Sequence, residues 1–264
     1  MSNIKCSIIP TMIYVAFLFF TFLIVLLALY QWQYFLVFSP RYFRQSELSN
    51  SCEILSITTD DGVELEGVVY EPLDAKGTLL FFGGREHDSV GLIDRLAENF
   101  KDMRIITFNY RSYGRSGGAI SEKNILNDAL KIATILQKNY GDFYILGFSL
   151  GASVAASVAS KHKSKGVFLL GAFDSIASIT KARYGVSLSW MLRYKFDNVE
   201  FVKNIKENVY MFSSKSDEVV PLKNARNLKE SVKELAFYEE FENLSHKELL
   251  WNDEVVSKIN GVLL

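Results

Sequence analysis

The 264-residue sequence contains little cysteine and no excess of charge of either sign. Its only two cysteines, Cys6 and Cys52, lie on opposite sides of a long apolar run. They cannot form a disulfide within one domain, so cysteine usage does not settle the redox compartment. The 29 Lys and Arg residues are balanced by 30 Asp and Glu residues. Without a basic excess, the composition gives no support to a nucleic-acid partner.

The sequence also lacks the signatures of nucleotide and cofactor binding. The glycine-rich segment at residues 109–118 does not end in the Gly-Lys-Ser/Thr of a P-loop, which disfavours nucleotide binding. No other motif indicates a bound group. We therefore expect no cofactor and no metal.

Residues 12–30 form a long apolar and aromatic run that only Thr21 interrupts. A run of about 20 residues is long enough to span a bilayer as a helix, and the Trp and Tyr that follow suit a membrane interface. A cleaved signal peptide is the alternative, but the run is long for one and no small-x-small cleavage site follows it. We predict a tail and transmembrane anchor at residues 1–38 and a polar stalk at residues 39–52.

The flanking charges say little about membrane orientation. Lys5 and the α-amino group precede the apolar run, and Arg41 and Arg44 follow it, so the positive-inside count is nearly balanced. A short amino-terminal tail before a single span is typical of an uncleaved signal anchor. On that ground we place the catalytic domain on the extracytoplasmic side.

Residues 53–264 suit one α/β domain with a sizeable core. The runs at residues 54–58 and 63–70 predict a hairpin that turns at Asp61 and Gly62. From there strands alternate with helices to the end of the chain, which predicts a mainly parallel sheet flanked by helices. The expected parallel strands are residues 78–82, 104–108, 143–148, 167–173, 209–214 and 235–241, and the closing helix is residues 247–259.

Ser149 is the candidate nucleophile. It follows the apolar run at residues 143–148 and precedes an Ala-rich, helix-favouring run. Gly147 and Gly151 flank it and allow a sharp strand-to-helix turn that exposes the hydroxyl. The five-letter Gly-x-Ser-x-Gly pattern is weak evidence alone, and the strand and helix around it make it much stronger.

A serine hydroxyl needs a base to become a good nucleophile, and the chain has only three histidines. His87 precedes the serine, against the chain order of α/β-hydrolase triads. His162 lies at the far end of the helix after Ser149, roughly 20 Å from the hydroxyl. His246, in the loop after the last predicted strand, is therefore the candidate base.

A carboxylate between the serine and the histidine should orient the imidazole. Asp217 follows the strand at residues 209–214, and Asp174 follows the strand at residues 167–173. We favour Asp217, because its strand immediately precedes the helix and strand that lead to His246. A turn aspartate that caps the next helix is the alternative role for Asp217.

Gly83 and Gly84 directly follow a predicted core strand. A glycine pair at that position suggests backbone that approaches a substrate closely. The backbone N–H groups of Arg85 and Leu150 are the candidate oxyanion hole. A tight strand-to-helix turn without catalytic purpose is the alternative.

Residues 174–207 interrupt the α/β alternation. The stretch at residues 187–196 carries several large apolar side chains and is too long for a simple connection, so we predict a small helical cap over Ser149. An equally good interpretation is that these side chains simply pack on the sheet.

Together these motifs resemble the α/β-hydrolase superfamily, and more narrowly the single-span, membrane-anchored hydrolases of the BEM46 and ABHD13 type. The matching stretches occur in the family's order at residues 59–67, 109–118, 147–152, 216–221 and 245–246. The resemblance implies an α/β-hydrolase fold with Ser149 as nucleophile, Asp217 as acid and His246 as base.

Three positions depart from the family pattern. Gly83 stands where relatives usually have His before Gly, Asn109 stands for the usual Asp, and Ser245 stands for the usual Gly before the catalytic His. The first departure concerns the oxyanion loop, and the triad is intact.

We expect a membrane-tethered serine hydrolase that cleaves an ester or thioester through an acyl-enzyme. The resemblance favours lipid-like acyl esters or S-acylated proteins as substrates, with the bilayer as a further partner. A serine peptidase of the same fold is the enzymatic alternative. The non-enzymatic alternative is a membrane-tethered interaction protein that has lost catalytic turnover.

Overall fold

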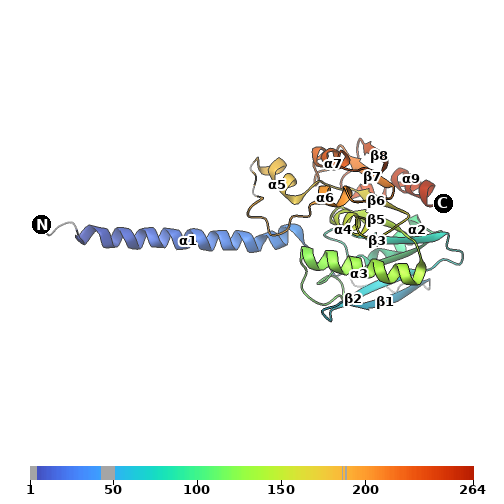
Figure 1. Ribbon diagram of the computed structural model, residues 1–264, viewed down its shortest axis with the longest axis horizontal. Helices are drawn as coiled ribbons and strands as arrows, with labels where there is room; N and C mark the ends of the chain where they lie inside the picture. Colours follow the sequence, from blue (N-terminus) through green and yellow to red (C-terminus); the bar gives the residue numbers. More distant parts are fainter. Residues whose placement is uncertain (1–4, 43–50, 186, 188) are drawn as a thin grey trace.

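The computed structural model describes residues 5–42, 51–185, 187 and 189–264. A long helix, α1 (Lys5–Val37), projects from an α/β domain that contains the rest of the described chain (Figure 1). The middle of the predicted stalk, residues 43–50, lies outside the described residues.

The described strands form one sheet in the order β1-β2-β4-β3-β5-β6-β7-β8. β1 and β2 form an antiparallel hairpin, β2 pairs antiparallel with β4, and every other pair is parallel. The sheet is therefore mainly parallel, as predicted. The strands are β1 (Cys52–Thr58), β2 (Glu64–Tyr70), β3 (Gly77–Phe82), β4 (Met103–Phe108), β5 (Tyr144–Phe148), β6 (Gly166–Leu170), β7 (Val209–Ser214) and β8 (Leu235–Phe241).

Helices cover both faces of this sheet, and each face has its own apolar core. Buried side chains of α3, α4, α6 and α7 belong to one core, and those of α2, α8 and α9 belong to the other. The helices of the domain are η1 (Val90–Leu92), α2 (Ile93–Asn99), α3 (Glu122–Tyr140), α4 (Leu150–Ala159), α5 (Ile176–Tyr184), α6 (Asn198–Val202), α7 (Leu222–Lys229), α8 (Glu248–Trp251) and α9 (Asp253–Leu263).

Local sequence explains several element boundaries. Gly62 adopts a φ of 79° in the hairpin turn, a value that glycine accepts without strain. The Ser121 hydroxyl accepts a hydrogen bond from the Asn124 N–H and so caps α3. Every residue of α4 is buried, and its Ala, Gly and Ser side chains are small enough to allow close packing between α3 and the sheet.

The predicted closing helix is in fact two helices. Asn252 interrupts it with an extended backbone (φ −74°, ψ 131°) between α8 and α9. The Asn252 side chain accepts hydrogen bonds from the Glu254 and Val255 N–H groups, which makes it the N-cap of α9. A favourable capping residue therefore ends one helix and begins the next.

The described residues of the stretch 187–196 are not helical, so that part of the cap prediction is wrong. Two short helices, α5 and α6, flank the stretch instead. Trp190 is 76% exposed, whereas Phe196 is fully buried. The Gln33 side chain donates to the Met191 carbonyl and accepts from the Arg193 N–H, so residues 191–193 lie against the end of α1.

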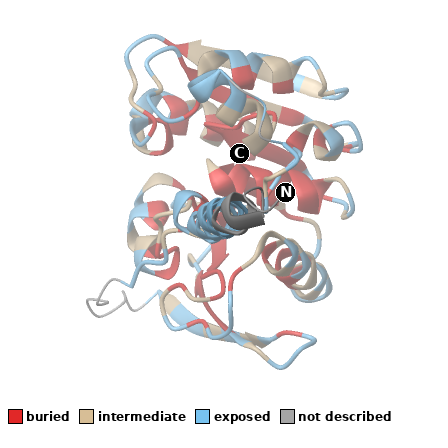
Figure 2. Cartoon of the chain, turned by 90° about the vertical axis from the view of Figure 1, so that its left-hand side faces the viewer, coloured by how far each residue is buried: buried red, intermediate tan, exposed pale blue. Residues whose placement is uncertain are grey.

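The carboxyl-terminal end of α1 is packed into the domain. Phe38 is 1% exposed, and its ring lies 4.7 Å from Tyr194 and 6.3 Å from Phe196 between centroids. Most side chains of residues 11–32 are exposed, as the view along the helix shows (Figure 2). The domain therefore holds the end of α1 firmly and leaves its apolar surface uncovered.

Candidate active site

Ser149 lies on a sharp turn between β5 and α4. Its backbone has φ 56° and ψ −117°, a strained conformation for a residue with a side chain. The Ser149 N–H donates to the Leu170 carbonyl at 2.8 Å, which ties the turn to the end of β6. The chain therefore holds the hydroxyl at the carboxyl end of the sheet.

The two flanking glycines are required by close backbone packing. A Cβ on Gly151 would lie 2.0 Å from the Phe82 carbonyl oxygen, and one on Gly147 would lie 2.4 Å from the Gly151 carbonyl oxygen. No side chain fits at either position. The turn thus brings α4 directly against the ends of β3 and β5.

His246 lies between Ser149 and Asp217. Its Nε2 is 2.8 Å from the Ser149 Oγ, and its Nδ1 is 2.6 Å from the Asp217 Oδ2. The imidazole is 6% exposed and the Asp217 carboxylate 3% exposed. The arrangement suits proton transfer from the hydroxyl to an imidazole that a buried carboxylate orients.

Backbone hydrogen bonds fix the Asp217 carboxylate. Its Oδ1 accepts from the Val219 and Val220 N–H groups at 2.8 and 2.7 Å, which leaves Oδ2 for His246. The neighbouring Glu218 accepts from the His246 N–H at 3.0 Å. The loop that carries Asp217 and the loop that carries His246 are therefore joined by two hydrogen bonds.

Asp174, the other candidate acid, has different partners. Its Oδ1 accepts from the Ser175 N–H and the Asn224 amide, and its Oδ2 accepts from the Asn227 amide. These contacts tie the start of α5 to α7. The structure thus brings Asp217, and not Asp174, against the imidazole.

Two backbone donors near the Ser149 turn are the candidates for an oxyanion hole. Among the described residues, neither the Arg85 N–H nor the Leu150 N–H donates a hydrogen bond. Leu150 is the first residue of α4, where the helix dipole also favours negative charge. Both groups are available to an oxygen that becomes negative during a reaction.

Three side chains that the sequence analysis did not single out hold this loop in place. The Tyr110 hydroxyl donates to the Gly83 carbonyl at 2.8 Å, and the Tyr113 hydroxyl donates to the Arg85 carbonyl at 2.6 Å. The His87 Nδ1 accepts from the Gly84 N–H at 3.2 Å. Both tyrosines belong to the glycine-rich segment after β4, and nothing in the sequence connects that segment to the loop after β3.

His87 must stay neutral to accept this bond. Burial lowers the pKa of His87 to about 4. The Phe148 ring lies between the rings of His87 and His246, at centroid distances of 5.3 and 4.9 Å. The loop after β3 and the loop that carries His246 therefore pack against the same aromatic residue.

The glycine-rich segment at residues 109–118 performs structural roles. Asn109 is buried, and its amide donates to both Glu66 and Asp88 at 3.0 and 2.7 Å. Its side-chain oxygen accepts from the Ser89 N–H at 2.7 Å. Arg111 makes bidentate ion pairs with Asp61 and Asp128. These bonds fasten β4 to the hairpin and to the start of η1.

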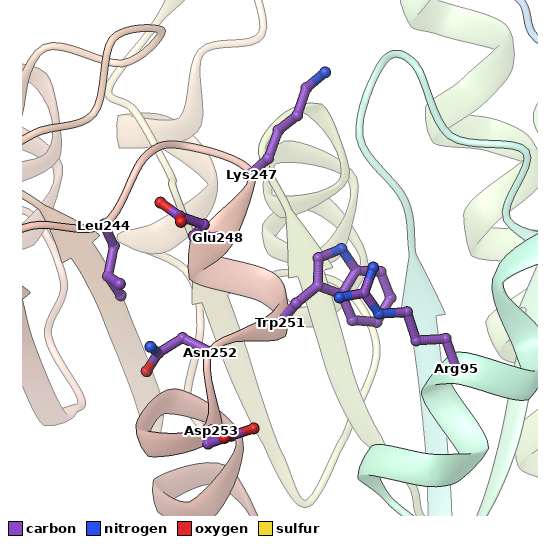
Figure 3. A pocket seen from close by; sticks show the side chains of 7 residues that line it. All are labelled: Arg95, Leu244, Lys247, Glu248, Trp251, Asn252 and Asp253. Carbon is purple, nitrogen blue, oxygen red and sulfur yellow. The ribbon is translucent and has the colours of Figure 1, made fainter.

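A groove of about 360 Å³ lies behind the histidine loop (Figure 3). The Arg95 guanidinium of α2 stacks on the Trp251 ring of α8 at 4.0 Å from the centroid. None of the three triad candidates lines it. Within the described parts of the chain, no cluster of three or more His, Cys, Asp or Glu residues could hold a metal ion.

Known proteins resemble this chain in sequence and in fold. The sequence model of the family described as alpha/beta hydrolase fold matches residues 77–197. Protein R595 of Acanthamoeba polyphaga mimivirus is 24% identical over 198 residues, which cover 66% of this chain and 67% of that protein. The lysophosphatidylserine lipase ABHD12 of Macaca fascicularis is 28% identical over 145 residues, 47% of this chain and 36% of that protein.

Solved structures share the architecture. The esterase Pf2001 of Pyrococcus furiosus superposes with a TM-score of 0.67 at 17% identity, covering 86% of this chain and 97% of the esterase. At that identity the likeness shows the fold. The predicted fold, a mainly parallel sheet flanked by helices after one apolar amino-terminal helix, is confirmed.

Proposed function

Because the chain has the α/β-hydrolase fold, we propose that it is a membrane-anchored serine hydrolase that cleaves carboxylic esters through an acyl-enzyme. The observation that carries the proposal is the unbroken line of hydrogen bonds from Ser149 through His246 to Asp217. Such a line on a strained strand-to-helix turn is the arrangement that acyl transfer requires.

The chemistry follows from the positions of these groups. The Ser149 Oγ attacks the ester carbonyl while His246 Nε2 takes its proton and then passes that proton to the leaving alcohol. A water molecule, deprotonated by the same nitrogen, then releases the acid and restores the serine. Asp217 keeps the imidazole in the required tautomer and stabilises its charged form.

The negative oxygen of each tetrahedral intermediate would accept from the Arg85 and Leu150 N–H groups. Removal of one such donor typically costs 10²- to 10³-fold in turnover. The loop that carries Arg85 has Gly83 where relatives usually have His, but Tyr110, Tyr113 and His87 fix its peptide groups. We therefore assign the oxyanion hole to this loop despite the altered sequence.

We propose that α1 anchors the enzyme in a membrane. Residues Thr11–Val37 are long and apolar enough to cross a bilayer. Gln33, within α1, and Phe38, just after it, pack against the domain, and this argues for retention of the helix. The extracytoplasmic side remains the predicted location of the domain.

The substrate class that fits best is an acyl ester of small-molecule or lipid type. One relative is named a lysophosphatidylserine lipase and one structural neighbour an esterase, and both cleave esters by name. Thioesters of S-acylated proteins undergo the same acyl transfer, so they belong to the same proposal. A substrate panel distinguishes the two.

The test is hydrolysis by the purified full-length protein of p-nitrophenyl esters and acyl thioesters with chains of two to sixteen carbons. We expect ester hydrolysis that Ser149→Ala abolishes. Ser160→Ala, at the far end of α4, is the matched control and should retain activity. Hydrolysis that survives Ser149→Ala would overturn the proposal.

A further inference from the structure

The segment from residue 175 to residue 196 has the composition of a membrane-interface element. It contains four Lys or Arg residues and no Asp or Glu. Two of its aromatic side chains, Tyr184 and Trp190, are 63% and 76% exposed. Exposed Trp and Tyr beside basic residues are typical of surfaces that contact lipid headgroups.

This segment lies against the end of α1 that leaves the apolar span. The Gln33 side chain binds the backbone at Met191 and Arg193 through both of its polar atoms. The Arg193 guanidinium donates to Gln31 at 3.0 Å and lies 5.7 Å from the Tyr30 ring centroid. Residues 190–193 therefore lie beside residues 30–33 of α1, at the same height along the helix axis.

The length of α1 sets where that level falls in a bilayer. No charged residue occurs between Lys5 and Arg41, so no charged side chain opposes immersion of the helix over this length. The apolar stretch Thr11–Val37 has 27 residues. At 1.5 Å per residue it is about 40 Å long, against a hydrocarbon core of about 30 Å. Its last turns, together with residues 190–193, consequently lie at the membrane surface.

Loops next to Ser149 are bonded to the same elements. Arg85, in the loop after β3, donates through its side chain to the Leu36 carbonyl of α1 at 2.5 Å. On the other side, Arg183 of α5 donates to the Glu218 and Val219 carbonyls, next to Asp217. The loops that surround Ser149 are thus joined to α1 and to α5. Figure 1 shows both helices on one end of the domain.

We propose that residues 175–185 and 189–196, together with the end of α1, form one surface that docks on the bilayer in which α1 is anchored, and that the site takes lipid esters directly from that bilayer. This inference rests on the proposed function for its second half. The contacts of Gln33, Phe38 and Arg85 hold the domain against the end of α1, which keeps this surface beside the membrane. An acyl chain can therefore pass from lipid to protein without crossing the aqueous phase.

The docking half is tested without any activity. In a Cys6→Ser, Cys52→Ser background, Trp190→Cys or Leu73→Cys carries an environment-sensitive fluorophore, and the full-length protein is reconstituted in phosphatidylcholine vesicles. Leu73, fully exposed in the turn before β3, is the control, because it lies at the end of that strand remote from α1. Doxyl groups on shallow lipid positions should quench the probe at 190 at least several-fold more than the probe at 73. Equal quenching at the two positions would overturn the docking surface.

The substrate half compares Trp190→Ser with Leu73→Ser. We expect Trp190→Ser to lower hydrolysis of a long-chain ester embedded in vesicles by about five-fold or more, and to leave a soluble short-chain ester and fluorophosphonate labelling unchanged. Leu73→Ser should change neither. An unchanged rate on vesicles, or an equal loss on both substrates, would contradict delivery from the bilayer. If the unaltered protein neither reacts with fluorophosphonate nor cleaves any ester, the proposed function fails, and the quenching measurement alone decides the docking.

Discussion

At the scale of single residues, the sequence was informative about the reacting groups and silent about the groups that support them. Ser149 and His246 are predictable because the glycine pattern and the scarcity of histidine leave few alternatives. Tyr110 and Tyr113 are not, because their partners lie on a loop that only the fold brings close. The departure at Asn109 also becomes intelligible: its amide donates to two carboxylates at once, which an aspartate could not do.

Asp217→Asn should lower turnover by about 10⁴-fold, because the amide cannot stabilise the imidazolium and favours the wrong tautomer. Asp174→Asn should retain most of the turnover, because Asp174 binds Ser175, Asn224 and Asn227 instead of the imidazole. Both variants are compared by kcat on a soluble ester after circular dichroism has shown them folded. The reverse pattern would move the acid to Asp174.

Asn109→Asp should destabilise the domain by about 3 kcal/mol at neutral pH, because it buries a third carboxylate beside Glu66 and Asp88. Urea unfolding of detergent-solubilised protein measures the free energy, with Asn109→Ala as the uncharged control. The aspartate variant should be the weaker of the two at pH 7 and approach the alanine variant at pH 4. Stability equal to that of the unaltered protein at pH 7 would contradict the role assigned to Asn109.

His87 predicts a pH dependence of stability. Its pKa falls from 6.5 to about 4 on folding because burial disfavours the charged ring, so the unfolded chain binds more protons between these values. Stability should therefore fall as the pH drops from 6.5 to 4, by at most about 3 kcal/mol. His87→Asn keeps an acceptor for the Gly84 N–H but cannot titrate, and its unfolding free energy should lose this part of the slope. If the unfolding free energy of both proteins changed with pH by the same amount, His87 would not be the source of this pH dependence.

At the scale of elements, hydrophobic patterns and turn residues predicted the strands better than the connections between them. The hairpin, the parallel strands and the cap at Ser121 follow from local residue choice. The stretch at residues 187–196 could not be predicted, because its conformation depends on hydrogen bonds to Gln33 and Glu122, far away in sequence. The break at Asn252 did have a local signal, since an Asn before two acidic residues is a favourable N-cap.

The turn between β5 and α4 depends on Gly151. Gly151→Ala should destabilise the domain by roughly 3 kcal/mol and reduce turnover, because the new Cβ would lie 2.0 Å from the backbone of Phe82. Gly261→Ala is the control: in α9 its Cβ would meet nothing within 4 Å, so stability should rise by about 0.5 to 1 kcal/mol. Unfolding free energies of the two variants measure the expected loss of stability in the first and the expected gain in the second. A Gly151→Ala protein of unaltered stability and turnover would show that the close approach is not required.

At the scale of the whole molecule, composition and the apolar run predicted one α/β domain after one membrane-spanning helix. The fit between the two parts was not predictable. Gln33 and Phe38 contact the domain at residues 191–196, and the Ser39 N–H donates to the Tyr113 hydroxyl. The same tyrosine contacts the loop of the proposed oxyanion hole, so the anchor and the active site share a supporting residue.

The central claim is that Ser149 forms the covalent acyl-enzyme, and one measurement tests it most directly. The full-length protein in detergent is treated with a fluorophosphonate, digested and sequenced by mass spectrometry. The account predicts one adduct per chain on the Ser149 hydroxyl, absent from Ser149→Ala and greatly slowed in His246→Ala. An adduct on another residue, or undiminished labelling of Ser149→Ala, would contradict it.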